Sequence, residues 1–211
     1  MIDSPHAGLS RDDAAIVAQQ LGRDPRGAQT VAWRCPCGRP GVVMTAPRLP
    51  NGVPFPTTYY LTCTQATKAC SSLEGAGVMA AMNRRLAQDQ SLAQTYREAH
   101  RSYLADRDLL AAQLGQDVPE IAGVSAGGMP DRVKCLHALA AQSLAKGPGV
   151  NPLGDEVLAA IGEFWRRPCL SRSVPADAGS AKIDEAEATG DDTAAGGAAQ
   201  QAAPRPSQGQ S

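Results

Sequence analysis

Two cysteines separated by one residue, Cys35 and Cys37, lie in the segment RCPCGRP and are followed directly by Gly38. Thiolates are preferred protein ligands of zinc and iron, so this pair could contribute to a metal site. Zinc-binding loops usually have two residues between their first two cysteines and a second pair of ligands at a characteristic spacing along the sequence, and neither feature occurs here. Further ligands would therefore have to come from distant parts of the chain.

A second segment with possible chemistry is GVSAGGMPDRVKCLH, in which Gly127 and Gly128 precede an expected helix start. Arg132 and Lys134 would then occupy the first turns of that helix. Backbone N–H groups and the helix dipole bind anions at such a place, so these four residues form a candidate anion-binding site. The chain lacks the phosphate-binding pattern G-x-x-x-x-G-K-[ST], and glycine-rich loops are usually turns.

A thiol enzyme is an alternative interpretation of the same segment. Cys135 follows the glycine-rich loop, and His137 or His100 could serve as its base, so the thiol could attack an acyl or phosphoryl group. No cysteine is followed by five residues and an arginine, the arrangement that binds phosphate in cysteine phosphatases. Whether the protein is an enzyme therefore stays open at this point.

The elements that would position these residues can be predicted from the pattern of residue types. Three runs rich in β-branched residues, TVAWRC, GVVMTAP and TTYYLTC (57–63), are separated by turn-forming segments and predict a three-stranded antiparallel sheet. Helices are expected from the cap Ser10 to Gly22, and over 65–74, 78–88, about 92–114, from near Pro130 to Gly147, and 152–165. The fold class is thus α+β: a small sheet packed by about five helices.

Composition sets the domain limits and narrows the functional classes. From residue 171 onward the only Val, Ile, Leu or Phe residues are Val174 and Ile183, so 171–211 should be a disordered Ala/Gly/Gln/Pro-rich tail. We expect a flexible start over 1–9 and one globular domain over 10–170. The chain has 20 basic and 21 acidic residues, so it lacks the excess of positive charge that is typical of nucleic-acid-binding proteins. No apolar run is long enough to span a membrane, and we expect a cytoplasmic protein with reduced cysteines.

Four segments in this order resemble a bacterial family of unknown function, DUF501, which is common in actinobacteria: RCPCGRP, PFPTTYYLTC, GVSAGGMPDRVKCLHAL and GPGVNPLGDEVL. The resemblance covers roughly residues 12–165 and implies no activity. Members are sometimes labelled septum formation initiator proteins, which implies a protein partner in cell division. Septum initiators are membrane-anchored coiled coils, however, and this chain has neither a span nor sustained heptads, so the label is better explained by gene neighbourhood.

The resemblance also implies a ligand set, because relatives carry the equivalents of Cys35, Cys63, Cys135 and His137. Several relatives have an aromatic residue in place of Cys37, which assigns that cysteine to packing. Three thiolates and one imidazole suit zinc or an iron–sulfur cluster. Cys35 and Cys63 each end a predicted strand and could meet at one rim of the sheet.

Helix geometry opposes part of this ligand set. Residues two apart in a helix point about 200° apart, so Cys135 and His137 cannot both face one metal from mid-helix. Either the helix begins later than Pro130 suggests, or one of the two residues is not a ligand. Cys70 and Cys169 have no motif around them and are assigned to packing. The functional hypotheses are a Cys/His metal protein, a thiol or anion-site enzyme, and an interaction protein without chemistry of its own.

Overall fold

The sheet of this computed structural model, which describes residues 9–170, has three antiparallel strands. Strands β1 (Ala28–Arg34), β2 (Pro40–Thr45) and β3 (Tyr59–Leu61) are arranged in the order β1-β2-β3, so the predicted sheet is confirmed. Strand β3 is shorter than predicted because the N–H groups of Thr62 and Cys63 both donate to the carbonyl of Gly41 and leave the ladder. Most of the expected flexible start and all of the expected disordered tail lie outside the residues that the structure describes.

The five residues between β1 and β2 form a tight turn that presents Cys35 and Cys37. The N–H of Cys35 donates to the carbonyl of Arg39 at 2.9 Å, and the N–H of Gly38 donates back to the carbonyl of Cys35 at 2.8 Å. Gly38 adopts a φ of +84°, a conformation that glycine accepts without steric cost. The turn therefore holds both cysteines at one end of the sheet.

Six α-helices accompany the sheet within residues 9–170, against the about five expected for the fold class, and they correspond to the six segments predicted to be helical. They are α1 (Arg11–Leu21), α2 (Thr64–Gly75), α3 (Val78–Gln88), α4 (Gln90–Leu114), α5 (Leu136–Lys146) and α6 (Pro152–Ile161). The predicted caps of the first helix are present, because the Ser10 hydroxyl accepts from the N–H of Asp13 and Gly22 adopts a left-handed conformation. None of the helices within residues 9–170 is long and apolar enough to cross a membrane.

Helix α5 begins at Leu136, so the prediction of a helix start near Pro130 is wrong. The side-chain amide of Asn83 on α3 pairs with both backbone groups of Val133, accepting from its N–H at 2.7 Å and donating to its carbonyl at 2.9 Å. This pairing holds the segment before α5 in a non-helical conformation. Cys135 consequently precedes the helix with extended backbone, at a φ of −153°.

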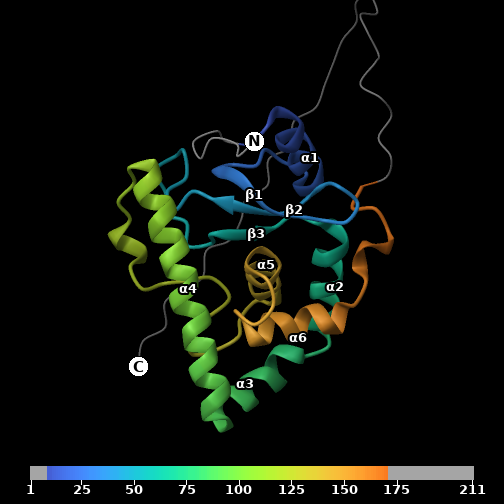
Figure 1. The fold of residues 1–211 in the computed structure, drawn as a ribbon, viewed down its shortest axis with the longest axis vertical. Helices are drawn as coiled ribbons and strands as arrows, with labels where there is room; N and C mark the ends of the chain where they lie inside the picture. Colours follow the sequence, from blue (N-terminus) through green and yellow to red (C-terminus); the bar gives the residue numbers. More distant parts are fainter. Residues whose placement is uncertain (1–8, 171–211) are drawn as a thin grey trace, which may run out of the picture. The chain divides into compact units, whose positions relative to one another are not determined.

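The core of the described region is built around α5. Figure 1 shows α5 end-on beside the sheet, with α4 on one side, α2 on the other and α6 next to it. Residues 138 to 143 of α5 are all buried, as expected for a helix with neighbours on every side. The first turn of α5 lies close to β3 and α2, and this junction carries the second group of reactive side chains described below.

Candidate metal centre

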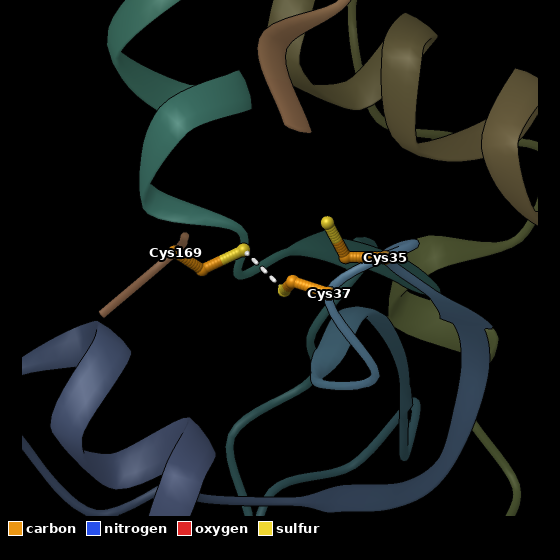
Figure 2. A group of neighbouring side chains, drawn as sticks. All are labelled: Cys35, Cys37 and Cys169. Atoms are coloured by element: carbon orange, nitrogen blue, oxygen red, sulfur yellow. Dashed lines mark hydrogen bonds between the residues drawn. The ribbon is translucent and has the colours of Figure 1, made fainter. Parts of the chain in front are cut away.

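Four cysteines from three separate parts of the chain converge at the rim of the sheet. Cys35 and Cys37 come from the β1–β2 turn, Cys63 from the residue before α2, and Cys169 from the segment after α6. The Sγ atom of Cys169 lies 3.1 Å from that of Cys63 and 3.5 Å from that of Cys37. The Sγ atoms of Cys35, Cys37 and Cys169 all lie within 4.8 Å of one another, and Cys63 adjoins this group through Cys169. Figure 2 shows the sulfur atoms of Cys37 and Cys169 directed toward each other, with Cys35 beside them. We call these four residues the four-cysteine centre.

Backbone N–H groups near the sulfur atoms influence their ionisation. The N–H groups of Gln65 and Ala66 in the first turn of α2, where helix donors lack internal partners, add to the effect of Cys169 in lowering the pKa of Cys63, although its sulfur makes no hydrogen bond that caps the helix. Against the opposing effect of burial, the N–H groups of Arg39 and Cys169 lower the pKa of Cys37. These N–H dipoles favour the thiolate forms of Cys63 and Cys37.

The four thiols share their protons unequally. The hydrogen bond from Cys169 lowers the pKa of Cys63 to about 6, against the opposing effect of burial. The same hydrogen bond raises the pKa of Cys169, which holds the proton. Burial raises the pKa of Cys35 to about 11. The metal-free centre at neutral pH therefore carries a thiolate on Cys63 that the neighbouring thiols stabilise.

The segment that carries Cys169 is fastened by side chains from two other elements. The guanidinium of Arg39 donates to the carbonyl of Leu170 at 2.6 Å. From the start of α2, the hydroxyl of Thr64 donates to the carbonyl of Cys169, and the amide of Gln65 donates to that of Pro168 at 3.2 Å. Three independent hydrogen bonds thus hold this segment against the turn and the helix that supply the other cysteines.

Cys135 and His137 belong to a different group from Cys35 and Cys63. The Sγ atom of Cys135 lies 3.7 Å from Nδ1 of His137, and the same nitrogen lies 3.1 Å from Oε1 of Glu74 on α2. The late start of α5 resolves the geometric objection to their proximity, because Cys135 lies outside the helix. The structure thus divides the four ligands implied by the resemblance between two places.

Two members of the four-cysteine centre had been assigned to packing from the sequence. Cys37 lies beside Cys169 rather than among apolar side chains alone, although the C-x-C spacing was visible. Cys169 stands alone in the sequence with no motif, and only its position in the fold reveals its neighbours. Cys70 is different, because it is fully buried in the core and burial raises its pKa to about 12.

The candidate anion-binding residues do not flank a helix start. Gly127 and Gly128 lie in the loop before α5, where their carbonyls accept from the N–H groups of Lys134 and Arg132 at 2.7 and 3.2 Å. The side chains of Arg132 and Lys134 are exposed to solvent, and the first helical residue is Leu136. The N–H groups of Arg132 and Lys134 are therefore engaged within the loop, and anion binding stays a prediction.

The same loop contains the pattern G-x-S-x-G over residues 123–127, which the sequence reasoning wrongly took to be absent. Hydrolases with this pattern expose the serine on a strand-to-helix turn. Here Ser125 follows a 3₁₀ turn and is 8% exposed, and its hydroxyl lies 2.9 Å from Nδ1 of His100. The hydroxyl also contacts the carbonyls of Ala126 and Met129, so this serine stabilises the loop.

Comparisons with known proteins identify a family but no activity. Searches of curated proteins and of solved structures found no match. A family model described as "Protein of unknown function (DUF501)" matches residues 31–159, which include Cys35, Cys37 and Cys63 and end before Cys169. The actinobacterial origin and the septum label implied by the resemblance find no support in these comparisons. Because the match covers more than half of the sequence, the chain belongs to the DUF501 family of proteins of unknown function.

Proposed function

We propose that this protein is a zinc-binding protein in which Cys35, Cys37, Cys63 and Cys169 hold one metal ion. The observation that carries the proposal is the approach of thiols from separate segments to Cys169: the Sγ atoms of Cys35 and Cys37 lie within 4.8 Å of its Sγ atom, and that of Cys63 lies 3.1 Å from it. Four cysteine ligands in tetrahedral arrangement are typical of structural zinc sites. The metal would join the β1–β2 turn, the start of α2 and the segment after α6.

The spacing of the sulfur atoms favours a single ion over an iron–sulfur cluster. A zinc–sulfur bond of about 2.3 Å places the ligands of a tetrahedral site about 3.8 Å apart. The distances of 3.1 Å between Cys63 and Cys169 and 3.5 Å between Cys37 and Cys169 are close to that value, and so is the 4.8 Å limit within which Cys35, Cys37 and Cys169 lie. An iron–sulfur cluster puts several iron and sulfide atoms between its cysteines and would require a wider separation.

The polar surroundings of the sulfur atoms also support this proposal. Backbone N–H donors to coordinating sulfurs orient the ligands and offset the negative charge of a four-thiolate site. Cys169 and, to a lesser extent, the nearby N–H groups of Gln65 and Ala66 lower the pKa of Cys63 to about 6. Thiols persist in reducing compartments, so the proposal agrees with the expected cytoplasmic location.

Metal content of purified variants tests the proposal against the ligand set implied by the family resemblance. Protein prepared under reducing conditions should contain one zinc per chain by elemental analysis. Cys37→Ser and Cys169→Ser should each lose the zinc and lower the melting temperature, because binding energy at a structural site is also folding energy. Cys135→Ser and His137→Ala should keep it.

The buried Cys70 provides the matched control, since Cys70→Ser changes a thiol in the core without changing the four-cysteine centre. It should retain one zinc per chain. Loss of zinc from Cys135→Ser and His137→Ala, with retention in Cys37→Ser and Cys169→Ser, would refute the proposal in favour of the other ligand set. Wild-type protein that folds without any metal would refute both ligand sets.

A further inference from the structure

A second group of reactive side chains, Glu74, Cys135 and His137, includes none of the residues of the four-cysteine centre. Cys135 is the residue before the first turn of α5, His137 lies in that turn, and Glu74 lies near the end of α2. The Sγ atom of Cys135, a ring nitrogen of His137 and a carboxylate oxygen of Glu74 lie within 4.8 Å of one another. The side chains of His137 and Glu74 are 25% and 24% exposed. The group is therefore assembled by the fold and accessible from solvent.

The hydrogen-bond partners of His137 fix its protonation. Its Nε2 atom lies 3.1 Å from the carbonyl oxygen of Thr67, which can only accept, so Nε2 carries a proton. Its Nδ1 atom lies 3.1 Å from Oε1 of Glu74, and the same oxygen accepts from the N–H of Leu136 at 2.7 Å. Both ring nitrogens thus face acceptors, and the arrangement favours an imidazolium ion.

The imidazolium lies directly beside the thiol of Cys135. The hydrogen bond to Cys135 raises the pKa of His137 to about 9, and the carboxylate of Glu74 adds to this effect. Burial opposes ionisation of Cys135, but the contact with His137 and the N–H of Ala138 outweigh it, so the pKa of this thiol lies below its usual value. A thiolate at a helix N-terminus beside a protonated histidine is the arrangement of reactive cysteines.

A cavity of about 700 Å³ opens onto this pair. It is lined by Cys135 and His137 together with four consecutive residues of the edge-strand segment, 59–62, and with residues from α1, α2 and the glycine-rich loop. Most of the lining is apolar, including Leu21, Leu61 and Ala126, while exposed Lys68 supplies one positive charge. A cavity of this size and character fits a small organic ligand with an apolar part.

We propose that Cys135 is a catalytic nucleophile for acyl transfer from esters or thioesters whose acyl group is apolar. The apolar lining favours an acyl group over a phosphoryl group, which would need several cationic or N–H donors. His137 is placed to hold and deliver the proton, and Glu74 is a positioning residue that keeps the imidazole oriented. The role is independent of the zinc proposal, because the two groups share no residue.

The reaction requires no oxidant, reductant or metal. The Sγ thiolate of Cys135 forms a bond to the acyl carbon, the bond from that carbon to the leaving oxygen or sulfur breaks, and the leaving group takes the proton from Nδ1 of His137. The products of this half are an acyl-thioester on Cys135 and a free alcohol or thiol. A water molecule then adds to the acyl carbon and gives a proton to Nδ1, which releases the carboxylic acid and restores the thiolate and the imidazolium.

Alkylation of the wild-type protein, as purified under reducing conditions, by iodoacetamide tests the state of the thiol, with each cysteine followed by mass spectrometry. Lowering a thiol pKa from about 8.5 to about 7.5 raises its thiolate fraction at pH 7 about eightfold and lowers its intrinsic nucleophilicity about threefold, and a still lower pKa brings no further gain. Cys135 should therefore react up to about threefold faster than an unperturbed thiol, with a midpoint below 8.5. Around it, the contact with Cys135 raises the pKa of His137, the carboxylate of Glu74 faces the imidazole, Lys68 and Lys134 are solvent-exposed, and Cys70 stays neutral because burial raises its pKa.

Turnover of p-nitrophenyl butyrate tests the acyl transfer itself. Wild-type protein should release one equivalent of nitrophenolate in a burst and carry a butyryl group on Cys135, detected by mass spectrometry. Cys135→Ser should abolish the burst, whereas Cys70→Ser, a nearby buried thiol outside the cavity lining, should retain it. His137→Gln should shift the midpoint of Cys135 alkylation towards higher pH, which a purely structural histidine would not do.

Three outcomes would overturn the acyl-transfer proposal. An alkylation midpoint of Cys135 at or above 8.5 in the wild-type protein would show that the thiol is not activated. A butyryl group on another residue would place the chemistry elsewhere. A zinc equivalent that disappears in Cys135→Ser would show that the group is a metal site.

Discussion

The hydroxyl of Tyr103 on α4 should be a major source of stability, because it is the shared acceptor for two buried backbone donors at the start of β3. The N–H groups of Thr58 and Tyr59 lie 2.7 and 3.3 Å from this oxygen. Tyr103 and Thr58 are fully buried, and burial raises the pKa of Tyr103 to about 12, so the hydroxyl is neutral at any ordinary pH. Tyr103→Phe keeps the ring and its edge-to-face contact with Tyr59 but removes the acceptor.

The size of the loss follows from the two unpaired donors. A buried donor left without a partner costs about 1 to 3 kcal/mol, and the longer of the two bonds contributes less, so Tyr103→Phe should lower the free energy of unfolding by about 2 to 4 kcal/mol. Urea denaturation followed by circular dichroism measures this as a lower midpoint at unchanged slope. The matched control is Tyr60→Phe, whose hydroxyl lies 3.5 Å from Arg23 at the surface and should cost less than about 0.5 kcal/mol. Equal losses in the two variants would refute the reasoning, since burial of the donors would then be irrelevant.

Three further predictions concern other parts of the fold. Asn151→Ala removes the cap of α6 and leaves the buried side-chain amide oxygen of Gln142 without its 2.9 Å donor, so it should cost about 2 to 4 kcal/mol in the free energy of unfolding. The exposed cap variant Asp89→Ala should cost about 1 kcal/mol, and a smaller loss at Asn151 than at Asp89 would contradict this. Gly154→Ala would place a Cβ atom against the backbone carbonyl of Leu139 on α5, so it should lower the melting temperature. Its control, Gly75→Ala, has open space around it and should raise the melting temperature slightly. The reverse order would show that α5 and α6 are not closely packed. Zinc binding at the four-cysteine centre displaces protons, so zinc affinity measured by competition with a chelator should fall as pH falls, and a pH-independent affinity would argue against thiolate ligands.

The sheet and most helices could be predicted because their signals are local. The cap residues Ser10 and Gly22 mark the two ends of α1, and β-branched runs mark the strands. The start of α5 could not be predicted, because it depends on a side chain far away in the chain. Pro130 is a typical first-turn residue, but the amide of Asn83 holds Val133 in a non-helical conformation, and no pattern near residue 130 reveals that contact.

The candidate site was only partly accessible to the same reasoning. Strand ends suggested that Cys35 and Cys63 lie near each other, and both belong to the four-cysteine centre. Cys37 was assigned to packing because several relatives have an aromatic residue at its position. That substitution in relatives does not show which residues lie beside Cys37 in this chain. Cys169 lies beyond the segment that the family model matches. Hydrogen bonds from Thr64 and Gln65 to backbone carbonyls hold it beside the other cysteines. Backbone carbonyls are the same in every residue, so the sequence around Cys169 does not predict these contacts.

The attachment of the segment 168–170 has a consequence for the order of folding. Its contact with Cys63 spans 106 residues, and closure of a chain loop costs about 0.6 kcal/mol more for every doubling of its length. The β1–β2 turn and the start of α2 are joined by a much shorter loop, so we expect them to meet before Cys169 joins them. Until then Cys35, Cys37 and Cys63 are an open trio of thiols without their last neighbour. We therefore expect these three thiols to be oxidised most easily while the protein folds, before the segment 168–170 packs against them.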